Sequence, residues 1–280
     1  MFIKLGLETL PAFFSVGVRF FIASVILYIY ALKLKLKFPK DITSHIFFFY
    51  FGLIFFAIPY GLVYWGEQYI GSGLTSVLFS IMPFYTILLS IKMYPEEKIT
   101  FRKTAGLLLG FVGILLIFGD QIDLGFEHDL SLYGMIAVML SPLFSAWGSI
   151  KGKKVGHQYQ PAILNTLPML YASISFLIVS YFTESTETLD LTGVAWFSLF
   201  YLGIFGTAVA FIVYFWMLKH TSILLMSTVT FITPPLALVW GWLVLDEQIT
   251  LKLVVGMIIV FTGVWFVKDI KIKPAGTPIK

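Results

Sequence analysis

Nine apolar stretches separated by short polar connections constrain this chain more than any other feature. A helix needs roughly 17–25 predominantly apolar residues to cross the hydrocarbon core of a bilayer. Only helices and closed barrels satisfy their own backbone polar groups there. The pattern therefore predicts an all-α, polytopic transmembrane helix bundle with no separate soluble domain. The stretches lie near residues 10–31, 46–68, 72–91, 104–119, 131–150, 161–182, 194–217, 222–245 and 251–268.

The composition agrees with this prediction and excludes several kinds of site. Hydrophobic residues make up 59% of the chain and charged residues 12%, where a soluble domain carries about 25% charged residues. The absence of cysteine excludes disulfides, thiolate metal sites and cysteine nucleophiles. The four histidines, His45, His128, His157 and His220, lie in separate loops or helix ends. The sequence therefore predicts no metal site and no cofactor.

The lysines and arginines predict how the bundle lies in the membrane. Of these 19 residues, 16 follow the first, third, fifth, seventh or ninth stretch, so they gather on one face of an alternating topology. Acidic residues crowd the opposite face, in segments 120–129 and 184–190. By the positive-inside rule the basic face is cytoplasmic, together with the tail 269–280. We expect a multi-pass plasma-membrane protein surrounded by the lipid bilayer, without a nucleic-acid partner.

The chain also repeats itself at an offset of 150 residues, and the two copies of the repeated loop lie five stretches apart on opposite faces. Basic residues surround only the first copy. The two halves, 1–119 and 131–268, are therefore predicted to be inverted repeats related by an axis in the membrane plane. Under this offset Glu97, Ile99, Thr100, Gly106, Gly113 and Tyr64 fall on Glu247, Ile249, Thr250, Gly256, Gly263 and Tyr214, and one inserted residue brings Pro83 onto Pro234.

Matching the two halves requires five spans in each, and the first half holds four. A cytoplasmic C-terminus and an odd number of spans also place the N-terminus outside, directly beside a span. We therefore expect one helix to be missing before Met1. About 20–30 upstream in-frame, mostly apolar codons would supply it, whereas a stop codon there would favour a truncated, nonfunctional or assembly-dependent protein.

Several segments resemble a known family. The stretch IKLGLETLPAFFSVGVRFFIASVIL at residues 3–27 looks like the end of the first helix and all of the second helix of the EamA-type permeases in the drug/metabolite transporter superfamily. Segments 83–113 and 234–263 look like the closing parts of that family's two repeats. The resemblance covers essentially the whole chain through small, apolar and punctuating residues. It implies a ten-helix, inverted-repeat secondary transporter of small metabolites, with the first helix absent here.

Arg19 most needs a reason, because it lies near the middle of the first stretch, where an arginine costs at least ~2.5–3.5 kcal/mol to insert. A functional interpretation turns it toward the bundle, where it pairs with an acid, carbonyls or an anionic substrate group. A structural interpretation has it lock helix packing through carbonyl hydrogen bonds, or extend to the inner face. The resembling family tends to carry an arginine here whatever its substrate, which favours the structural interpretation.

The acidic residues lie at the ends of the spans. Glu97 and Glu247 each precede an Ile-Thr pair and a helix start, which favours helix capping over proton coupling. Glu67 lies at the outer end of its span, where a solvated position is favoured over a gate. No Asp or Glu occupies the middle of a span, which argues against a buried carboxylate relay; a coupling ion or proton stays open.

Polar and aromatic residues at helical spacing predict the walls of a substrate cavity. Residues at i, i+4 and i+8 share one helix face, and a proline kink is tolerated where it lines a cavity. The alternatives are close helix approach through small hydroxyl residues, and interfacial anchoring or core packing for the Trp and Asn. Gly106, Gly110 and Gly113 are expected only to pack. The candidates are Tyr60, Tyr64, Gln68, Ser76, Ser80, Trp147, Asn165, Tyr214, Ser227 and Thr230, with kinks at Pro83 and Pro234.

These features together predict a secondary transporter, a permease or exporter of small neutral or zwitterionic metabolites such as amino acids. It would work by alternating access between the repeats, which rock around the two kinks. An intramembrane enzyme acting on lipids would need a clustered acid, base or metal constellation at one face. The sequence shows none, so no catalytic residue is predicted. The direction of transport and the formation of a homodimer stay open.

Overall fold

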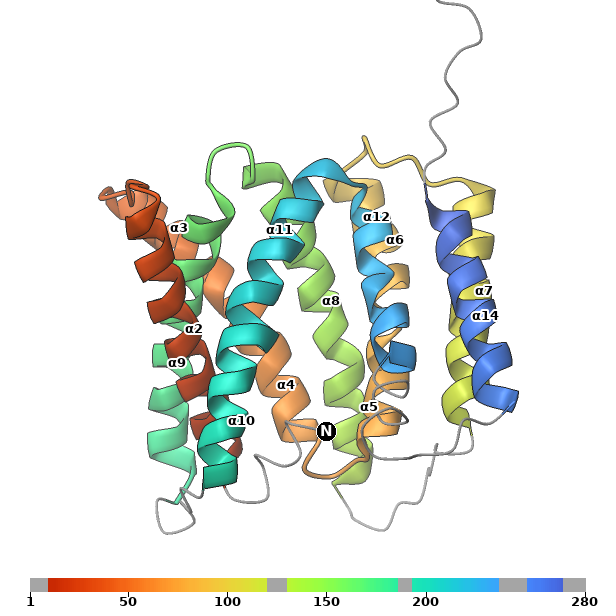
Figure 1. Ribbon diagram of the computed structural model, residues 1–280, viewed down its shortest axis with the longest axis horizontal. Helices are drawn as coiled ribbons and strands as arrows, with labels where there is room; N and C mark the ends of the chain where they lie inside the picture. The colour runs from red at the N-terminus through yellow and green to blue at the C-terminus, as the bar shows by residue number, and fades with distance from the viewer. Residues whose placement is uncertain (1–9, 120–129, 186–192, 237–250, 269–280) are drawn as a thin grey trace, which may run out of the picture.

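The computed structural model describes residues 10–119, 130–185, 193–236 and 251–268, and every regular element in these ranges is helical (Figure 1). Two of them, labelled η, are π-helical. The elements are α2 (Ala12–Lys33), α3 (Ile42–Gly52), η1 (Leu53–Ala57), α4 (Ile58–Gly66), α5 (Ser72–Phe79), α6 (Met82–Met93), α7 (Phe101–Phe118), α8 (Ser131–Val155), α9 (Pro161–Thr183), α10 (Gly193–Gly203), η4 (Ile204–Val209), α11 (Ala210–His220), α12 (Ile223–Ser227) and α14 (Leu251–Val267).

These elements combine into helices that match the predicted stretches, so the prediction of an all-α polytopic membrane bundle is confirmed. The described residues contain seven helices long and apolar enough to cross a membrane, and two shorter apolar helices. The predicted stretch 222–245 continues beyond Leu236 into residues outside the described ranges. The long helices are Ala12–Lys33, Ile42–Gly66, Gly73–Met93, Phe101–Phe118, Ser131–Val155, Pro161–Thr183 and Trp196–His220, and the short ones are Ile223–Leu236 and Leu251–Val267.

The second helix begins earlier than the sequence-based prediction of residue 46, at Ile42. Its N-cap is Asp41, whose Oδ2 accepts a hydrogen bond of 2.8 Å from the backbone N–H of Ser44. An aspartate in this role satisfies one of the free amides of the first turn. The hydrogen bonds from Ser44 also lower the pKa of the Asp41 carboxyl. The apolar pattern alone missed this start because the first turn is polar.

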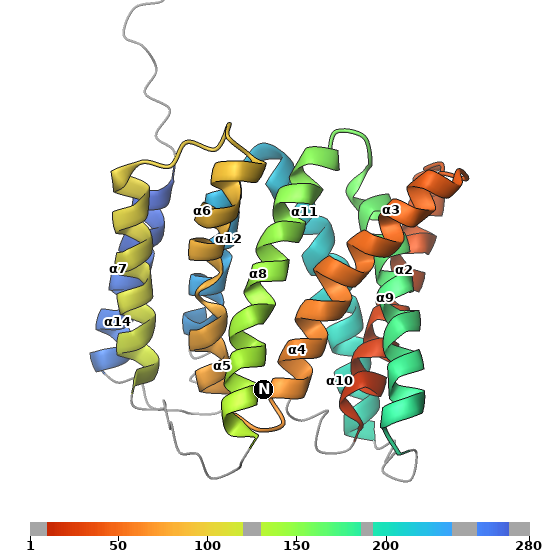
Figure 2. The same ribbon diagram turned by 180° about the vertical axis from the view of Figure 1, so that it is seen from behind.

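The helices cross the bundle in alternating directions (Figures 1 and 2). The connections 34–41, 94–100, 156–160 and 221–222 lie at one end, at the top of Figure 1. We call this the basic end, because most of the lysines and arginines cluster in and beside these connections. The connection 67–71 lies at the opposite end. This alternation is the one that the charge pattern predicted.

Helices α7 and α14 pair at one edge of the bundle in both views (Figures 1 and 2). A Cβ atom added to Gly106 would lie 2.6 Å from the carbonyl oxygen of Gly263, and one added to Gly113 would lie 2.9 Å from that of Gly256. Gly106 and Gly256 are repeat-related, as are Gly113 and Gly263, so each contact is the image of the other. The helices therefore run antiparallel about a two-fold axis, as inverted repeats require. The packing role predicted for the glycines is confirmed.

A second contact between the repeats is formed by α2 and α9, which pack against each other at the other edge of the bundle. Gly52, directly before η1, contacts the backbone of Pro168 in α9. Gly203, directly before η4, would place a Cβ atom 3.3 Å from the carbonyl oxygen of Arg19 in α2. Each repeat thus carries a π-helical segment after a glycine that packs on the other repeat.

Candidate functional site

One cavity, of about 420 Å³, lies between the two repeats. Its wall comes from α2, η1, α4, α5 and α6 of the first repeat, and from α8, α11 and the segment 223–236 of the second. No Asp or Glu lines it within the described part of the chain. The polar lining residues are Arg19, Tyr60, Thr75, Ser76, Ser141, Ser145, Ser149, Tyr214, Thr230 and Thr233, and the apolar ones are Phe55, Pro59, Val63, Phe79, Met82, Phe211, Met226, Val229 and Pro234.

Among the described lining residues only Arg19 is charged, and its side chain joins three elements. Its Nε donates to Thr207 Oγ1 at 2.7 Å, and its Nη1 to the Tyr64 hydroxyl at 3.1 Å. Nη2 donates to the Gly206 carbonyl oxygen at 3.2 Å. Since Arg19 lies in α2, Tyr64 in α4, and Gly206 and Thr207 in η4, the guanidinium joins both repeats. The residue is 4% exposed.

The aromatic ring of Tyr60 packs against the Arg19 guanidinium. The guanidinium carbon lies 5.3 Å from the centroid of the Tyr60 ring, within the range of a cation–π contact. The same ring packs edge-on against Phe20, with centroids 4.9 Å apart. The Arg19 charge is therefore held by hydroxyl, carbonyl and aromatic groups at the cavity wall.

A row of serines on α8 forms another part of the wall. Ser141, Ser145 and Ser149 recur every four residues and so share one helix face. Ser141 donates to the Pro59 carbonyl oxygen at 2.9 Å, and the Ser149 and Tyr214 hydroxyls lie 2.6 Å apart. The sequence-based prediction missed these serines, although their spacing carries the same signal as the stripes it used.

Thr75 was also not predicted from the sequence, and it differs from the other threonines of the lining. It is 6% exposed, and its Oγ1 has no hydrogen-bond partner. The other lining threonines behave differently, since Thr230 donates to the Ser227 carbonyl oxygen at 2.9 Å and Thr233 to that of Val229 at 2.8 Å. A buried hydroxyl without a partner loses the hydrogen bonds that water would give it. Thr75 therefore brings an unmet hydrogen-bonding group to the cavity lining.

The structure brings about half of the predicted site residues into this lining. They are Arg19, Tyr60, Ser76, Tyr214, Thr230 and Pro234.

Four other candidates lie elsewhere. Tyr64 is fully buried and accepts the hydrogen bond from Arg19. Gln68 follows the end of α4, where its Nε2 lies 3.5 Å from the Tyr64 carbonyl oxygen. The Ser80 and Ser227 hydroxyls donate to carbonyl oxygens of their own helices, at 2.6 and 2.7 Å. These contacts support helix packing and the positioning of Arg19.

The remaining candidates also lie outside the lining. The ring of Trp147 lies 5.7 Å from Lys151 Nζ. Asn165 is fully buried, and its Nδ2 donates to the Pro161 carbonyl oxygen at 2.7 Å. Pro83 is the second residue of α6 and follows an interruption between α5 and α6. Its repeat mate in the lining, Pro234, lies six residues after a similar interruption at Thr228.

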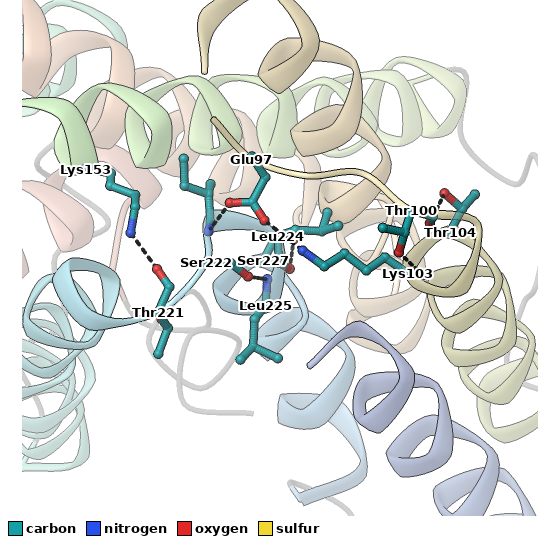
Figure 3. Close-up of polar contacts among 11 residues, drawn as sticks. Glu97, Thr100, Lys103, Thr104, Lys153, Thr221, Ser222, Leu224, Leu225 and Ser227 are labelled. Atoms are coloured by element: carbon teal, nitrogen blue, oxygen red, sulfur yellow. Dashed lines mark hydrogen bonds and ion pairs between the residues drawn. The ribbon is translucent and has the colours of Figure 1, made fainter. Parts of the chain in front are cut away.

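Polar contacts close the basic end, away from the cavity (Figure 3). Oε2 of Glu97 accepts a hydrogen bond of 3.0 Å from the backbone N–H of Ile223, the first residue of α12. Oε1 of Glu97 pairs with Lys103 Nζ at 3.4 Å. Helix α7 is capped instead by Thr100, whose Oγ1 accepts from the Lys103 N–H at 3.3 Å. Glu97 thus caps a helix as predicted, but in the other repeat. Its mate Glu247 lies outside the described residues.

Two lysines hold the end of α11 in the same region. Lys153 Nζ, from α8, donates to the carbonyl oxygens of Leu218 and Thr221 at 2.7 and 2.5 Å. Lys219 Nζ donates to the Tyr159 carbonyl oxygen at 3.1 Å. Cations at a helix C-terminus satisfy its free carbonyl groups. The connection between α11 and α12 is therefore fixed from both repeats.

Aromatic side chains fill the space between this closure and the cavity. The rings of Phe55 and Phe215 have centroids 5.5 Å apart, and those of Phe51 and Phe215 6.3 Å apart. Phe51 and Phe215 are fully buried or nearly so, and each lies nearer the basic end along its helix than the lining residues Phe55 and Phe211. The cavity is therefore separated from the basic end by packed aromatic rings.

Comparison with known proteins gives consistent results. The profile of the EamA-like transporter family matches residues 1–119 and 132–268. The uncharacterized transporter YoaV of Bacillus subtilis is 28% identical over 267 residues, which cover 94% of this chain and 89% of YoaV. An uncharacterized transporter of Buchnera aphidicola subsp. Schizaphis graminum is 31% identical over 84% of this chain and 77% of its own.

Two further matches bear on function and fold. A probable amino-acid metabolite efflux pump of Escherichia coli is 25% identical over 94% of this chain and 87% of its own. A crystal structure of a protein superposes with a TM-score of 0.80 and 15% identity, over 95% of this chain and 93% of that chain. At this identity the second match concerns the fold alone.

Proposed function

The chain belongs to the EamA-like transporter family, so its function is membrane transport, and we propose that it carries small neutral or zwitterionic metabolites such as amino acids. The observation that carries this proposal is a cavity of about 420 Å³ whose wall comes from both inverted repeats. A site between inverted repeats is where secondary transporters hold their substrates. The volume falls in the range of about 300–1,000 Å³ that is typical of small-molecule sites.

The proposed mechanism is alternating access across the plasma membrane, with the basic end facing the cytoplasm. The Glu97–Ile223 contact and the Phe51–Phe215 pair support this mechanism, because they close one side of the cavity through interactions between the repeats. Opening that side would separate Glu97 from the start of α12. Opposite motions of the two repeats would then expose the cavity to each side in turn.

The chemistry of the wall supports an amphipathic substrate. The aromatic and aliphatic residues, such as Phe79, Phe211 and Met226, suit an apolar group, and the serine row suits hydrogen-bonding groups. The relative described as a probable amino-acid metabolite efflux pump makes amino acids the first class to measure.

Flux of radiolabelled amino acids into proteoliposomes tests the proposal. Tyr214 lines the cavity, whereas Tyr133 is 59% exposed on the outer surface of α8. Wild-type protein and the Tyr133→Ala control should carry at least one amino acid faster than protein-free liposomes, and Tyr214→Ala should slow it strongly. The proposal fails if no amino acid crosses above background, or if Tyr214→Ala behaves as the control does.

A further inference from the structure

Arg19 is a buried cation at the cavity wall whose described partners carry no negative charge. Its hydrogen bonds go to two hydroxyl groups and one carbonyl oxygen. Glu67, beyond the end of α4, acts on it through space but does not line the cavity. A buried charge is expensive unless a counter-charge pairs with it. The cavity therefore carries a positive charge that a ligand can neutralise.

The guanidinium also has donors left for such a ligand. Arginine offers five N–H groups in a planar fork, and three of the five donate to described acceptors. The remaining two, one on each Nη, have no acceptor in the described ranges. A carboxylate accepts parallel hydrogen bonds from such a fork. The two N–H donors without an acceptor and the positive charge therefore both favour binding of a carboxylate.

Thr75 gives an independent indication that a polar ligand group belongs here. It lines the same cavity as Arg19, and its buried Oγ1 has no partner. A hydroxyl can donate one hydrogen bond and accept two, so it can serve either a carboxylate or an amino group. The rest of the polar lining consists of hydroxyl groups, and among the described residues no acid is present there to bind an ammonium group.

We propose that Arg19 binds the carboxylate of the transported molecule, and that the substrates are carboxylates with an apolar remainder. Amino acids with apolar side chains belong to this class, whereas the corresponding amides and amines do not. The amino group is dispensable because the described lining holds no counter-charge for it. This inference rests on the proposed transport function and defines its substrate class by the carboxylate, whether the whole molecule is a zwitterion or an anion.

A matched set of four compounds tests it with the purified chain in detergent. L-Phenylalanine and 3-phenylpropanoate carry the carboxylate, whereas L-phenylalaninamide and 2-phenylethylamine share the ring and lack it. Ligand binding is followed by calorimetry and by the rise in thermal stability that a bound ligand causes. The two carboxylates should bind, and the amide and the amine should bind about 10- to 100-fold more weakly, as expected when a charged hydrogen bond is lost.

Variants of Arg19 separate substrate binding from a purely structural role. Arg19→Gln should abolish the preference for carboxylate over amide. Arg19→Lys should keep the sign of that preference with weaker binding, because an ammonium group lacks the planar fork. Tyr64→Phe, which removes an Arg19 partner outside the lining, should lower stability and reduce the preference far less than Arg19→Gln does. If Arg19 only fixed helix packing, none of its folded variants would change the ratio.

Thr75 provides a second variant that does not disturb the arginine. Thr75→Val should weaken carboxylate binding without loss of folding. Ser90→Ala is the matched control, because Ser90 is likewise buried with an unpartnered hydroxyl but lies outside the lining. If Arg19→Gln does not fold, Arg19→Lys and Thr75→Val decide the question.

The outcomes distinguish this inference from the function on which it rests. Equal binding of acid and amide by wild-type protein, with transport of either, would overturn the role of Arg19 and leave transport intact. No binding and no flux of any of the four compounds, or of any amino acid, would overturn the proposed function and the inference together. Carboxylate preference that disappears in Arg19→Gln supports both.

Discussion

The Glu97 carboxylate of the first repeat accepts a hydrogen bond of 3.0 Å from the backbone N–H of Ile223 in the second repeat. Glu97 is 8% exposed, and its other oxygen pairs with Lys103. Separating the two residues breaks a hydrogen bond to a charged group, which contributes about 1.5–3 kcal/mol. This contact therefore favours closure of the basic end.

Removing that contact should expose the cavity to the basic end. In a Ser145→Cys background, which places a single thiol in the lining, Glu97→Ala should raise the rate of modification by a membrane-impermeant thiol reagent added at the basic end about 10-fold or more. Glu96→Ala is the matched control, because the neighbouring Glu96 is exposed. Equal rates in the two variants would show that Glu97 does not hold this end closed.

The Arg19–Tyr64 hydrogen bond should contribute measurably to stability. Tyr64→Phe removes the hydroxyl that accepts from Nη1 at 3.1 Å and leaves the ring in place. The loss of a buried hydrogen bond to a charged group predicts destabilisation by about 1.5–3 kcal/mol, measured by denaturant unfolding in detergent. Tyr133→Phe, on the exposed face of α8, should change stability by less than about 0.5 kcal/mol; a similar loss in both variants would contradict the assigned role.

The glycines between α7 and α14 should not tolerate a larger side chain. A Cβ atom at Gly106 would lie 2.6 Å from the Gly263 carbonyl oxygen and 2.7 Å from the Phe266 Cβ. Overpacking of this kind predicts that Gly106→Ala destabilises the protein by about 1–3 kcal/mol. Gly71→Ala is the comparison, because nothing lies within 4 Å of a Cβ atom there. Thermal unfolding that affects both variants equally would refute the close contact.

The Asp41 cap should make the start of α3 sensitive to acid. The pKa of Asp41 is lowered in the folded chain by hydrogen bonds from Ser44. Its contribution is therefore fully present above the ordinary value of 3.8 and is lost as the pH falls through the lower, folded pKa. The stability difference between wild type and Asp41→Ala should shrink in that acidic range. Asp41→Asn, which keeps the cap without the charge, should show no such trend, and a pH-independent difference would contradict the assignment.

The absence of cysteine makes the orientation of the bundle directly measurable. Lys154→Cys and Gly71→Cys each place a single thiol at an exposed position, the first near the basic end and the second at the opposite end. In intact cells an impermeant reagent should label Gly71→Cys and spare Lys154→Cys until the membrane is opened. The reverse pattern would place the basic end outside.

The helices and their inverted arrangement could be predicted because both depend on the membrane. A chain that crosses the bilayer must satisfy its backbone polar groups internally, which requires helices, and the bilayer thickness sets the length of each apolar stretch. Lysines and arginines gather in the connections on the cytoplasmic face. The start of α3 could not be predicted from apolar length, because Asp41 and Ser44 set it through one hydrogen bond.

The cavity was harder to predict because repeat-related residues have different surroundings. Tyr64 and Tyr214 are mates in the sequence, yet the Tyr64 hydroxyl accepts from Arg19 while Tyr214 meets Ser149 in the lining. In the second repeat the position that corresponds to Arg19 is held by Pro168, whose backbone lies against Gly52 as the Arg19 backbone lies against Gly203. Because only the first repeat has an arginine at this position, Tyr64 binds that arginine and lies outside the cavity lining, whereas Tyr214 lines the cavity.

Protection of a cavity thiol by substrate tests the central claim most directly. Ser145→Cys in proteoliposomes should carry L-phenylalanine, lose that flux when a thiol reagent modifies it, and be modified more slowly when L-phenylalanine is present. These results would place the substrate in the cavity between the repeats. Flux that continues unchanged after complete modification, with no protection by L-phenylalanine, would contradict the account.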